Sequence, residues 1–299
     1  MCEFCTEHGE GKKWYLQMKN YSDELLYQEL SSIQKDIIKA ETRVKWRDNF
    51  FENTVIPACR NVKKSNNAMK SVSQPAPKLS DEEALAQRKV MHFGQVLPLE
   101  DVEKVIDMVD SITRMPCGCR YKTTGKEDKR YCFGIGVDKL GILGNYPDAA
   151  SSLEVINKKE TKKLFRKFDG EGLIHSIWSN VTPYIGAICN CDRDCLPYYM
   201  GYITQERIPN FFRAEYVCKV DRDLCTGCKS CMAQCQFGAQ FYSSTLSKVD
   251  INPARCFGCG VCRAVCPTDA ISLVPKETIP GIADIWLRNA QPTKSFVSA

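Results

Sequence analysis

Two short runs of cysteine near the C-terminal end decide the fold of that part of the chain. They read Cys225-Thr-Gly-Cys228-Lys-Ser-Cys231-Met-Ala-Gln-Cys235 and Cys256-Phe-Gly-Cys259-Gly-Val-Cys262-Arg-Ala-Val-Cys266-Pro267. Both repeat the spacing C-x-x-C-x-x-C-x-x-x-C, which is the ligand spacing of [4Fe–4S] clusters. Zinc sites instead use two separated C-x-x-C pairs, so we interpret both runs as iron–sulfur ligands.

The order of the cysteines also predicts which cluster each of them ligates. The first three of a run lie on one tight loop around a cubane, whereas the fourth begins a helix, points away and ligates the other cluster. We therefore expect cluster one to be held by Cys225, Cys228, Cys231 and Cys266, and cluster two by Cys256, Cys259, Cys262 and Cys235. Glycines inside the loops (Gly227, Gly258 and Gly260) would let backbone N–H groups approach the sulfurs.

Segments with strand character flank the two runs, from Tyr216 to Asp221 and from Ala270 to Val274. With both motifs complete, residues 216–275 resemble the bacterial ferredoxin family that carries two [4Fe–4S] clusters. The resemblance implies a small α+β fold with internal pseudo-twofold symmetry and one-electron transfer between the clusters. This chain departs from the family at Gln236, which stands where a proline usually follows the fourth cysteine. The departure removes no ligand, but the sequence then does not decide how polar the surroundings of cluster two are.

The remainder of the chain predicts an α+β protein with an α-rich, cysteine-rich region before the ferredoxin-like module. Apolar residues at helical spacing predict helices over Asn20 to Val55, Leu99 to Ser111 and Thr161 to Phe168. The predicted division is an N-terminal cysteine pair with a long helix (1–60), a linker (61–79), a cysteine-rich metal-binding domain (80–212), the two-cluster domain (213–278) and a tail (279–299).

Composition bounds where the protein works and what it binds. The 18 cysteines stand in tight groups, unlike a secreted disulfide framework, and the first residues, MCEFCTEHGEG, lack the regions of a signal peptide. We therefore expect a reducing cytoplasm. No segment has the apolar length of a membrane span. The net charge of +5 is mild and its lysines are dispersed, which suits an acidic protein partner and does not indicate nucleic acid.

A second group of cysteines stands in the middle of the chain. These are Cys117 and Cys119, then Cys132, then Cys189, Cys191 and Cys195. We predict a third iron–sulfur cluster held by Cys119, Cys132, Cys191 and Cys195, on the reasoning that the side chains of a C-x-C pair diverge. Cys117 and Cys189 are the alternates, because the sequence does not decide which member of a pair binds. Structural zinc is the alternative, and simple buried thiols are a weaker one.

The surrounding motifs resemble a cysteine-rich region attached to ferredoxin modules in strict anaerobes. The residues that carry the resemblance are Pro116-Cys117-Gly-Cys119-Arg120, Tyr131-Cys132, Gly172-Leu173-Ile174-His175, Cys189-Asn190-Cys191 and Cys195. No defined reaction follows from it. We interpret His175 as a core residue with satisfied hydrogen bonds, and Cys218 as a core thiol beside cluster one.

The N-terminus carries a further candidate site. Cys2 and Cys5 form a C-x-x-C pair followed by His8, and Cys59 could return to them at the end of a helical hairpin. These four residues would suit zinc or a further iron–sulfur centre. Thr6 follows Cys5 where a c-type haem site requires histidine, so haem attachment is excluded.

These patterns predict an iron–sulfur electron-transfer subunit of an anaerobic cytoplasmic oxidoreductase complex. Single electrons would pass through two [4Fe–4S] clusters and a third centre to a flavin- or metal-containing partner subunit. No residue is predicted to be catalytic. Two alternatives remain: an oxidoreductase with its own substrate site at the middle cysteines, and a zinc-stapled interaction scaffold that carries a ferredoxin module.

Overall fold

The computed structural model describes residues 13–16, 94–126, 128–136, 147, 153–181, 184–195 and 211–282. The predicted helix over 20–55, the linker over 61–79 and most of the tail lie outside the described residues. The same holds for Cys2, Cys5, His8 and Cys59, so the N-terminal site stays a prediction.

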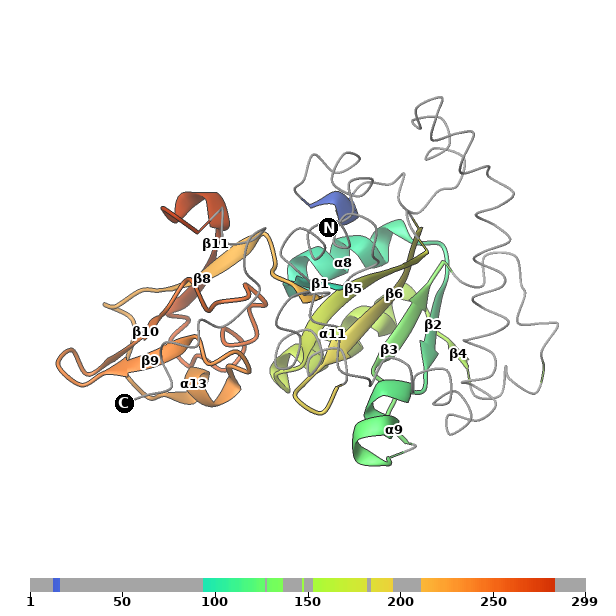
Figure 1. Ribbon diagram of the computed structural model, residues 1–299, viewed down its shortest axis with the longest axis horizontal. Helices are drawn as coiled ribbons and strands as arrows, with labels where there is room; N and C mark the ends of the chain where they lie inside the picture. Colours follow the sequence, from blue (N-terminus) through green and yellow to red (C-terminus); the bar gives the residue numbers. More distant parts are fainter. Residues whose placement is uncertain are drawn as a thin grey trace, which may run out of the picture.

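A seven-stranded sheet forms the middle of the molecule, with the strand order β4-β2-β3-β6-β5-β1-β7 (Figure 1). Neighbouring strands are antiparallel except β1 and β7, which are parallel. The strands are β1 (Gly94–Leu97), β2 (Ile112–Met115), β3 (Cys132–Ile135), β4 (Glu154–Val155), β5 (Ile174–Val181), β6 (Tyr184–Cys191) and β7 (Phe211–Phe212).

The sheet shows that the expectation of an α-rich middle region is wrong. The long central strands, β5 and β6, are largely buried, so apolar residues occupy both of their faces. A buried strand of this kind does not show the alternation of apolar and polar residues that marks a half-exposed strand, and periodicity alone cannot distinguish it from a helix. The predicted cysteines Cys132, Cys189 and Cys191 therefore lie on strands rather than in loops.

Two predicted helices are present and share one core with the sheet. They are α8 (Leu99–Met108) and α11 (Lys158–Gly170). The Asn157 side chain caps α11 by accepting a hydrogen bond of 2.9 Å from the backbone N–H of Glu160. The core gathers buried side chains from both helices and from the strands; Phe165 of α11, for example, lies 4.8 Å from Phe133 of β3 between ring centroids. A third helix, α9 (Gly118–Thr124), contains Cys119 and directly follows Cys117.

The C-terminal module contains two separate antiparallel pairs of strands. β8 (Tyr216–Val220) pairs with β11 (Ile271–Pro275), and β9 (Gln240–Ser243) pairs with β10 (Lys248–Ile251). Short helices, α13 (Ser230–Gln234) and η7 (Lys276–Thr278), complete it. Both predicted strands, near 216–221 and 270–274, are formed as β8 and β11. The module is ferredoxin-like, and it adjoins the end of the large sheet that carries β1 and β7 (Figure 1).

Polar contacts, some buried and some exposed, join the module to the middle domain. The side-chain amide of Gln95, on β1, donates to Glu215 at 3.0 Å, just before β8. The Tyr216 hydroxyl donates to Asp101 of α8 at 3.0 Å. Arg263 forms two hydrogen bonds with the carboxylate of Glu100, at 2.6 and 2.9 Å. Contacts between a side chain of one unit and a carboxylate of the other fix the two units in one arrangement.

Candidate metal centres

The predicted ligands of cluster one surround a single cavity. Cys225, Cys228 and Cys231 reach it from the first loop and from α13, and Cys266 reaches it from the second run. The first loop is possible because Gly227 has φ +70°, and a Cβ atom there would lie 2.3 Å from the carbonyl oxygen of Ser247. The structure thus brings together cysteines from both runs, as the sequence spacing predicts.

The predicted ligands of cluster two surround a second cavity. Its lining includes Cys256, Cys259, Cys262 and the cysteine from the other run, Cys235, and none of its lining residues is charged. Backbone N–H groups are directed at the sulfurs: Gly258 donates to Cys256 at 3.4 Å and Ala239 donates to Cys235 at 3.3 Å. Four sulfurs around an apolar cavity, with N–H donors to the sulfurs, fit a cubane.

A fifth thiol lines the cavity of cluster two. The backbone N–H of Cys218 donates to the sulfur of Cys256 at 3.4 Å, and the sulfurs of Cys218 and Cys262 lie 3.7 Å apart. The expectation that Cys218 lies beside cluster one is therefore wrong. Cys218 is on β8, and the pairing of β8 with β11 turns this residue toward the other cavity.

The middle cysteines meet at the end of the large sheet where β3 begins and β6 ends, and we call them the six-cysteine site. Cys132 of β3 lies directly opposite Cys189 of β6. Cys191 follows two residues later on β6, Cys195 lies in the turn after it, and Cys117 and Cys119 lie at the start of α9. The sulfurs of Cys117 and Cys132 are 3.3 Å apart. The site contains all six predicted thiols: Cys117, Cys119, Cys132, Cys189, Cys191 and Cys195.

The expectation that the two side chains of a C-x-C pair diverge is wrong for Cys189 and Cys191. Side chains at i and i+2 of a strand point to the same face, so Cys189 and Cys191 do not diverge. Asn190, between them, points to the opposite face, and its Oδ1 accepts a hydrogen bond of 2.6 Å from Nδ1 of His175. His175 is fully buried beside Phe165 and belongs to the core, on the face away from the cysteines.

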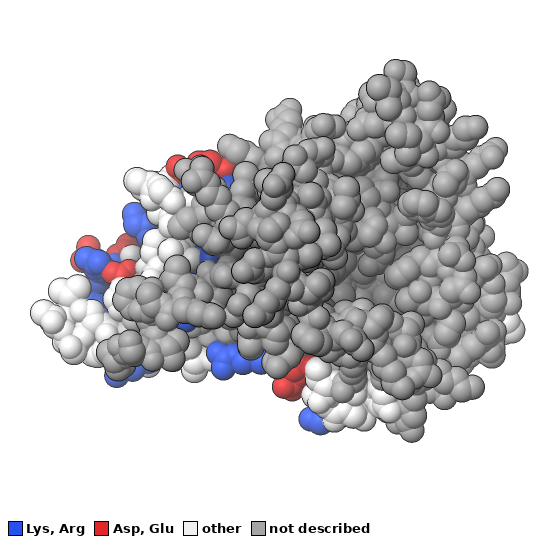
Figure 2. Space-filling model, viewed as in Figure 1, with Lys and Arg blue, Asp and Glu red and all other residues white. Residues whose placement is uncertain are grey.

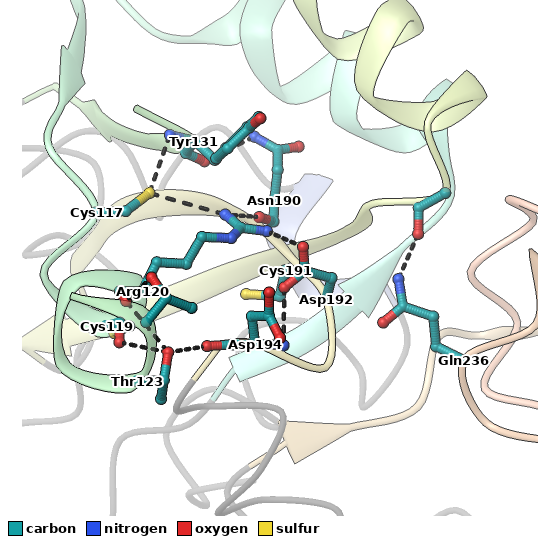
Figure 3. Close-up of polar contacts among 12 residues, drawn as sticks. Cys117, Cys119, Arg120, Thr123, Tyr131, Asn190, Cys191, Asp192, Asp194 and Gln236 are labelled. Atoms are coloured by element: carbon teal, nitrogen blue, oxygen red, sulfur yellow. Dashed lines mark hydrogen bonds and ion pairs between the residues drawn. The ribbon is translucent and has the colours of Figure 1, made fainter. Parts of the chain in front are cut away.

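A buried guanidinium group lies among the thiols (Figure 3). Arg120 is 3% exposed. It forms an ion pair of 2.6 Å with Asp192, donates to the carbonyl oxygen of Asn190 at 3.1 Å, and approaches the sulfur of Cys117 to 3.9 Å. Its plane lies 4.3 Å from the ring centroid of Tyr131. The spacing of the cysteines does not identify Arg120 as a cation beside the thiols. The signal that could have identified it is its position directly after Cys119.

The thiols affect one another's ionisation. A hydrogen bond with Cys132, and then burial, raise the pKa of Cys117 well above its usual range. Burial raises the pKa of Cys119 to about 12. Conversely, hydrogen bonds from Cys189 and Cys195 lower the pKa of Cys191. A site of buried thiols can hold several thiolates only if cationic charge compensates them, and Arg120 supplies a single positive charge. A metal centre would supply the rest.

In the described part of the chain, no group of three or more His, Cys, Asp or Glu side chains converges closely enough to hold a single metal ion. Among the same residues, no helix has the length and apolar character to span a membrane.

Comparison with known proteins identifies the C-terminal module alone. The family described as "4Fe-4S dicluster domain" matches residues 224–271. The archaeal-type glutamate synthase [NADPH] of Thermotoga maritima is 37% identical over 59 residues, which are 20% of this chain and 12% of the relative. The indolepyruvate oxidoreductase subunit IorA of Pyrococcus abyssi is 39% identical over 56 residues, 19% of this chain and 9% of the relative.

A further relative is a component of the ion-translocating oxidoreductase complex of Methanosarcina acetivorans. It is 40% identical over 57 residues, 19% of this chain and 20% of the relative. The chain thus spans a fifth or less of the length of these curated relatives.

Proposed function

Because residues 224–271 are a ferredoxin-type 4Fe–4S domain, we propose that this protein is an iron–sulfur electron-transfer subunit of an anaerobic cytoplasmic oxidoreductase complex. It passes single electrons and has no catalytic residue of its own. The observation that carries the proposal is the pair of cavities, each lined by four cysteines drawn from both runs. Relatives described as oxidoreductase components support the same role.

In this proposal the ligand sets are those that the spacing predicts. Cluster one is held by Cys225, Cys228, Cys231 and Cys266, and cluster two by Cys256, Cys259, Cys262 and Cys235. The clusters supply one-electron redox chemistry when bound. The chain's own groups hold the sulfurs, donate backbone hydrogen bonds to them and exclude water from cluster two, which together set the potentials.

The six-cysteine site is proposed as a third iron–sulfur centre. Four of its six thiols would bind, with Cys119, Cys132, Cys191 and Cys195 as the first candidates and Cys117 and Cys189 as alternates. The convergence of the sulfurs and the buried Arg120 support an anionic centre at this place. The N-terminal residues Cys2, Cys5, His8 and Cys59 are proposed for zinc or a further cluster on their sequence pattern alone.

A polar cleft gives some support to a second candidate function. Its lining includes Asp192, Arg193 and Asp194, which follow Cys191 directly. A substrate bound there would lie beside the six-cysteine site, so the chain could be an oxidoreductase with a substrate site of its own. The cleft is widely open, and active sites usually enclose most of their ligand. We therefore prefer the electron-transfer role.

Anaerobic purification of the full chain from its native source tests the choice. The electron-transfer role predicts co-purification with flavin- or metal-containing subunits and no turnover by the isolated, reduced chain. The isolated chain should still take up electrons from dithionite and give the electron paramagnetic resonance (EPR) signals of reduced [4Fe–4S] clusters. Substrate turnover by the isolated chain would refute the electron-transfer role and support the function of an enzyme with its own substrate site.

A further inference from the structure

The two clusters of the ferredoxin module have different surroundings. The three loop cysteines of cluster two, Cys256, Cys259 and Cys262, are all buried, and apart from Gln240 their cavity is lined by apolar residues and other cysteines. In the loop of cluster one, Cys228 is exposed to solvent. Because electron transfer weakens steeply with distance, a partner in solution can approach cluster one closely, whereas cluster two is shielded by protein.

The side chains that shield cluster two belong to the core that it shares with the six-cysteine site. This core contains Cys191 and Cys195 from the middle domain and Cys259 from the second run. It also contains Phe237 and Phe257, whose rings are stacked with centroids 4.0 Å apart. One continuous packed region therefore runs from the six-cysteine site to the ligands of cluster two.

Hydrogen bonds cross the same contact. Arg193, which lies between Cys191 and Cys195 in sequence, donates to the carbonyl oxygen of Cys235 at 3.4 Å and to that of Gln236 at 3.3 Å. The side chain of Gln236 donates in turn to the carbonyl oxygen of Gly172 (Figure 3). A proline at position 236 could not make this last bond. The departure from the ferredoxin pattern thus coincides with the docking of the module onto the middle domain.

We infer that the six-cysteine site exchanges electrons with cluster two, that Arg193 and Gln236 are positioning residues for this step, and that cluster one is the port for an external redox protein. The inference rests on the proposed third centre. In each step one electron leaves one centre, which is oxidised by one unit, and reduces the next; no bond forms or breaks and no proton needs to move.

The surface around the port indicates how the partner is recognised. Leu224 and Leu246 are about half exposed beside the first loop: Leu224 directly precedes Cys225, and Leu246 precedes Ser247, whose carbonyl oxygen lies against Gly227. Among the described residues, the other exposed large apolar side chains are Phe241 and Val155. On the face of the molecule drawn in Figure 2, the visible described part of the module carries both basic and acidic side chains. This surface has exposed apolar side chains, and neither positive nor negative charge dominates around them. It therefore suits a redox protein whose cofactor is surrounded by apolar residues at its own surface.

The internal step is tested in the full chain with the double variant Arg193→Leu/Gln236→Pro. The matched control is Arg222→Leu, because Arg222 is also exposed but pairs with Asp250 inside the ferredoxin module. Photoreduced flavin delivers electrons in a flash, and absorption and EPR follow their redistribution among the centres. Losing these hydrogen bonds should loosen the contact between the two units and slow redistribution to the third centre severalfold, with iron content and the control unchanged.

Two results would overturn the inference, and they differ. Wild-type protein without a third paramagnetic centre would refute the proposed third centre and this inference together. In the other result the third centre is present, with the same magnetic coupling to cluster two and the same rate of electron exchange in the wild type and the double variant. That result would refute only the path through Arg193 and Gln236.

The port is tested with Leu224→Asn/Leu246→Asn, using Val155→Asn as the control at a distant exposed position. The probes are cytochrome c as a protein acceptor and ferricyanide as a small one. We expect oxidation of the reduced chain by cytochrome c to slow severalfold only in the double variant, with ferricyanide unaffected. Equal rates with cytochrome c in all three proteins would refute the docking surface.

Discussion

Replacing Arg120 by methionine is the most informative single change in the six-cysteine site. Methionine keeps much of the side-chain length but removes the charge and every donor. The change would leave Asp192 without its partner at 2.6 Å and the carbonyl oxygen of Asn190 without its donor at 3.1 Å. It would also remove the stacking on Tyr131.

The magnitude follows from these contacts. Breaking a fully buried ion pair costs about 3–5 kcal/mol, but the Asp192 side chain is 30% exposed and water can partly replace the guanidinium. We expect the free energy of unfolding to fall by about 3 kcal/mol, hydrogen bonds and stacking included. The loss of a positive charge beside the thiolates should also lower the reduction potential of the third centre, because reduction adds negative charge.

Chemical denaturation under anaerobic conditions measures the first effect, and a potentiometric titration followed by EPR measures the second. Arg120→Lys is the control, because it keeps the charge but loses the planar fork, and it should fall between the wild type and Arg120→Met. If Arg120→Met has wild-type stability and an unchanged potential for every centre, the guanidinium does not compensate an anionic centre, and this part of the reasoning is wrong.

Three other predictions follow from local features. In metal-free protein, iodoacetamide should alkylate Cys228 before Cys231, as measured by peptide mass spectrometry. Hydrogen bonds from Ser230 lower the pKa of the exposed Cys228 thiol, whereas burial raises the pKa of Cys231 to about 11. Faster labelling of Cys231 would contradict this prediction. The hydrogen bond from Arg263 lowers the pKa of Glu100 below its ordinary 4.5. The ionised carboxylate therefore stabilises the fold above that pH, and its contribution is lost as the pH falls through the lowered value. Glu100→Gln should cost under about 1 kcal/mol at pH 7, because the side chain is 54% exposed, and the difference from wild type should shrink as the pH falls through the lowered pKa of Glu100. Gly227→Ala should lower cluster-one occupancy, measured as iron per chain, because the new methyl group would meet the backbone; full occupancy would refute the close approach.

The ferredoxin module can be predicted because its information is local. The spacing of Cys225 through Cys235 dictates a loop that wraps a cubane, and the crossing of the fourth cysteine follows from the same geometry. The helices near Leu99 and Thr161 are equally accessible, because each shows one apolar face at helical spacing.

The middle domain is harder because its information is not local. Buried strands such as β5 lack the alternation of apolar and polar residues that identifies a strand. The sequence therefore predicts the cysteine ligands of this region but not the sheet that carries them. Once Cys189 and Cys191 are on a strand, their common direction follows at once. The contact of Gln236 with Gly172 depends on how two units dock, and a single sequence carries no pattern for that.

The most direct test of the account is a count of iron, sulfide and zinc in the full chain, purified without exposure to oxygen. Two [4Fe–4S] clusters and a third cubane predict about twelve irons per chain, matching sulfide and no zinc in the six-cysteine site. About eight irons accompanied by zinc would contradict the third centre and favour a metal-stapled scaffold. Fewer than about eight irons would contradict the two-cluster assignment itself.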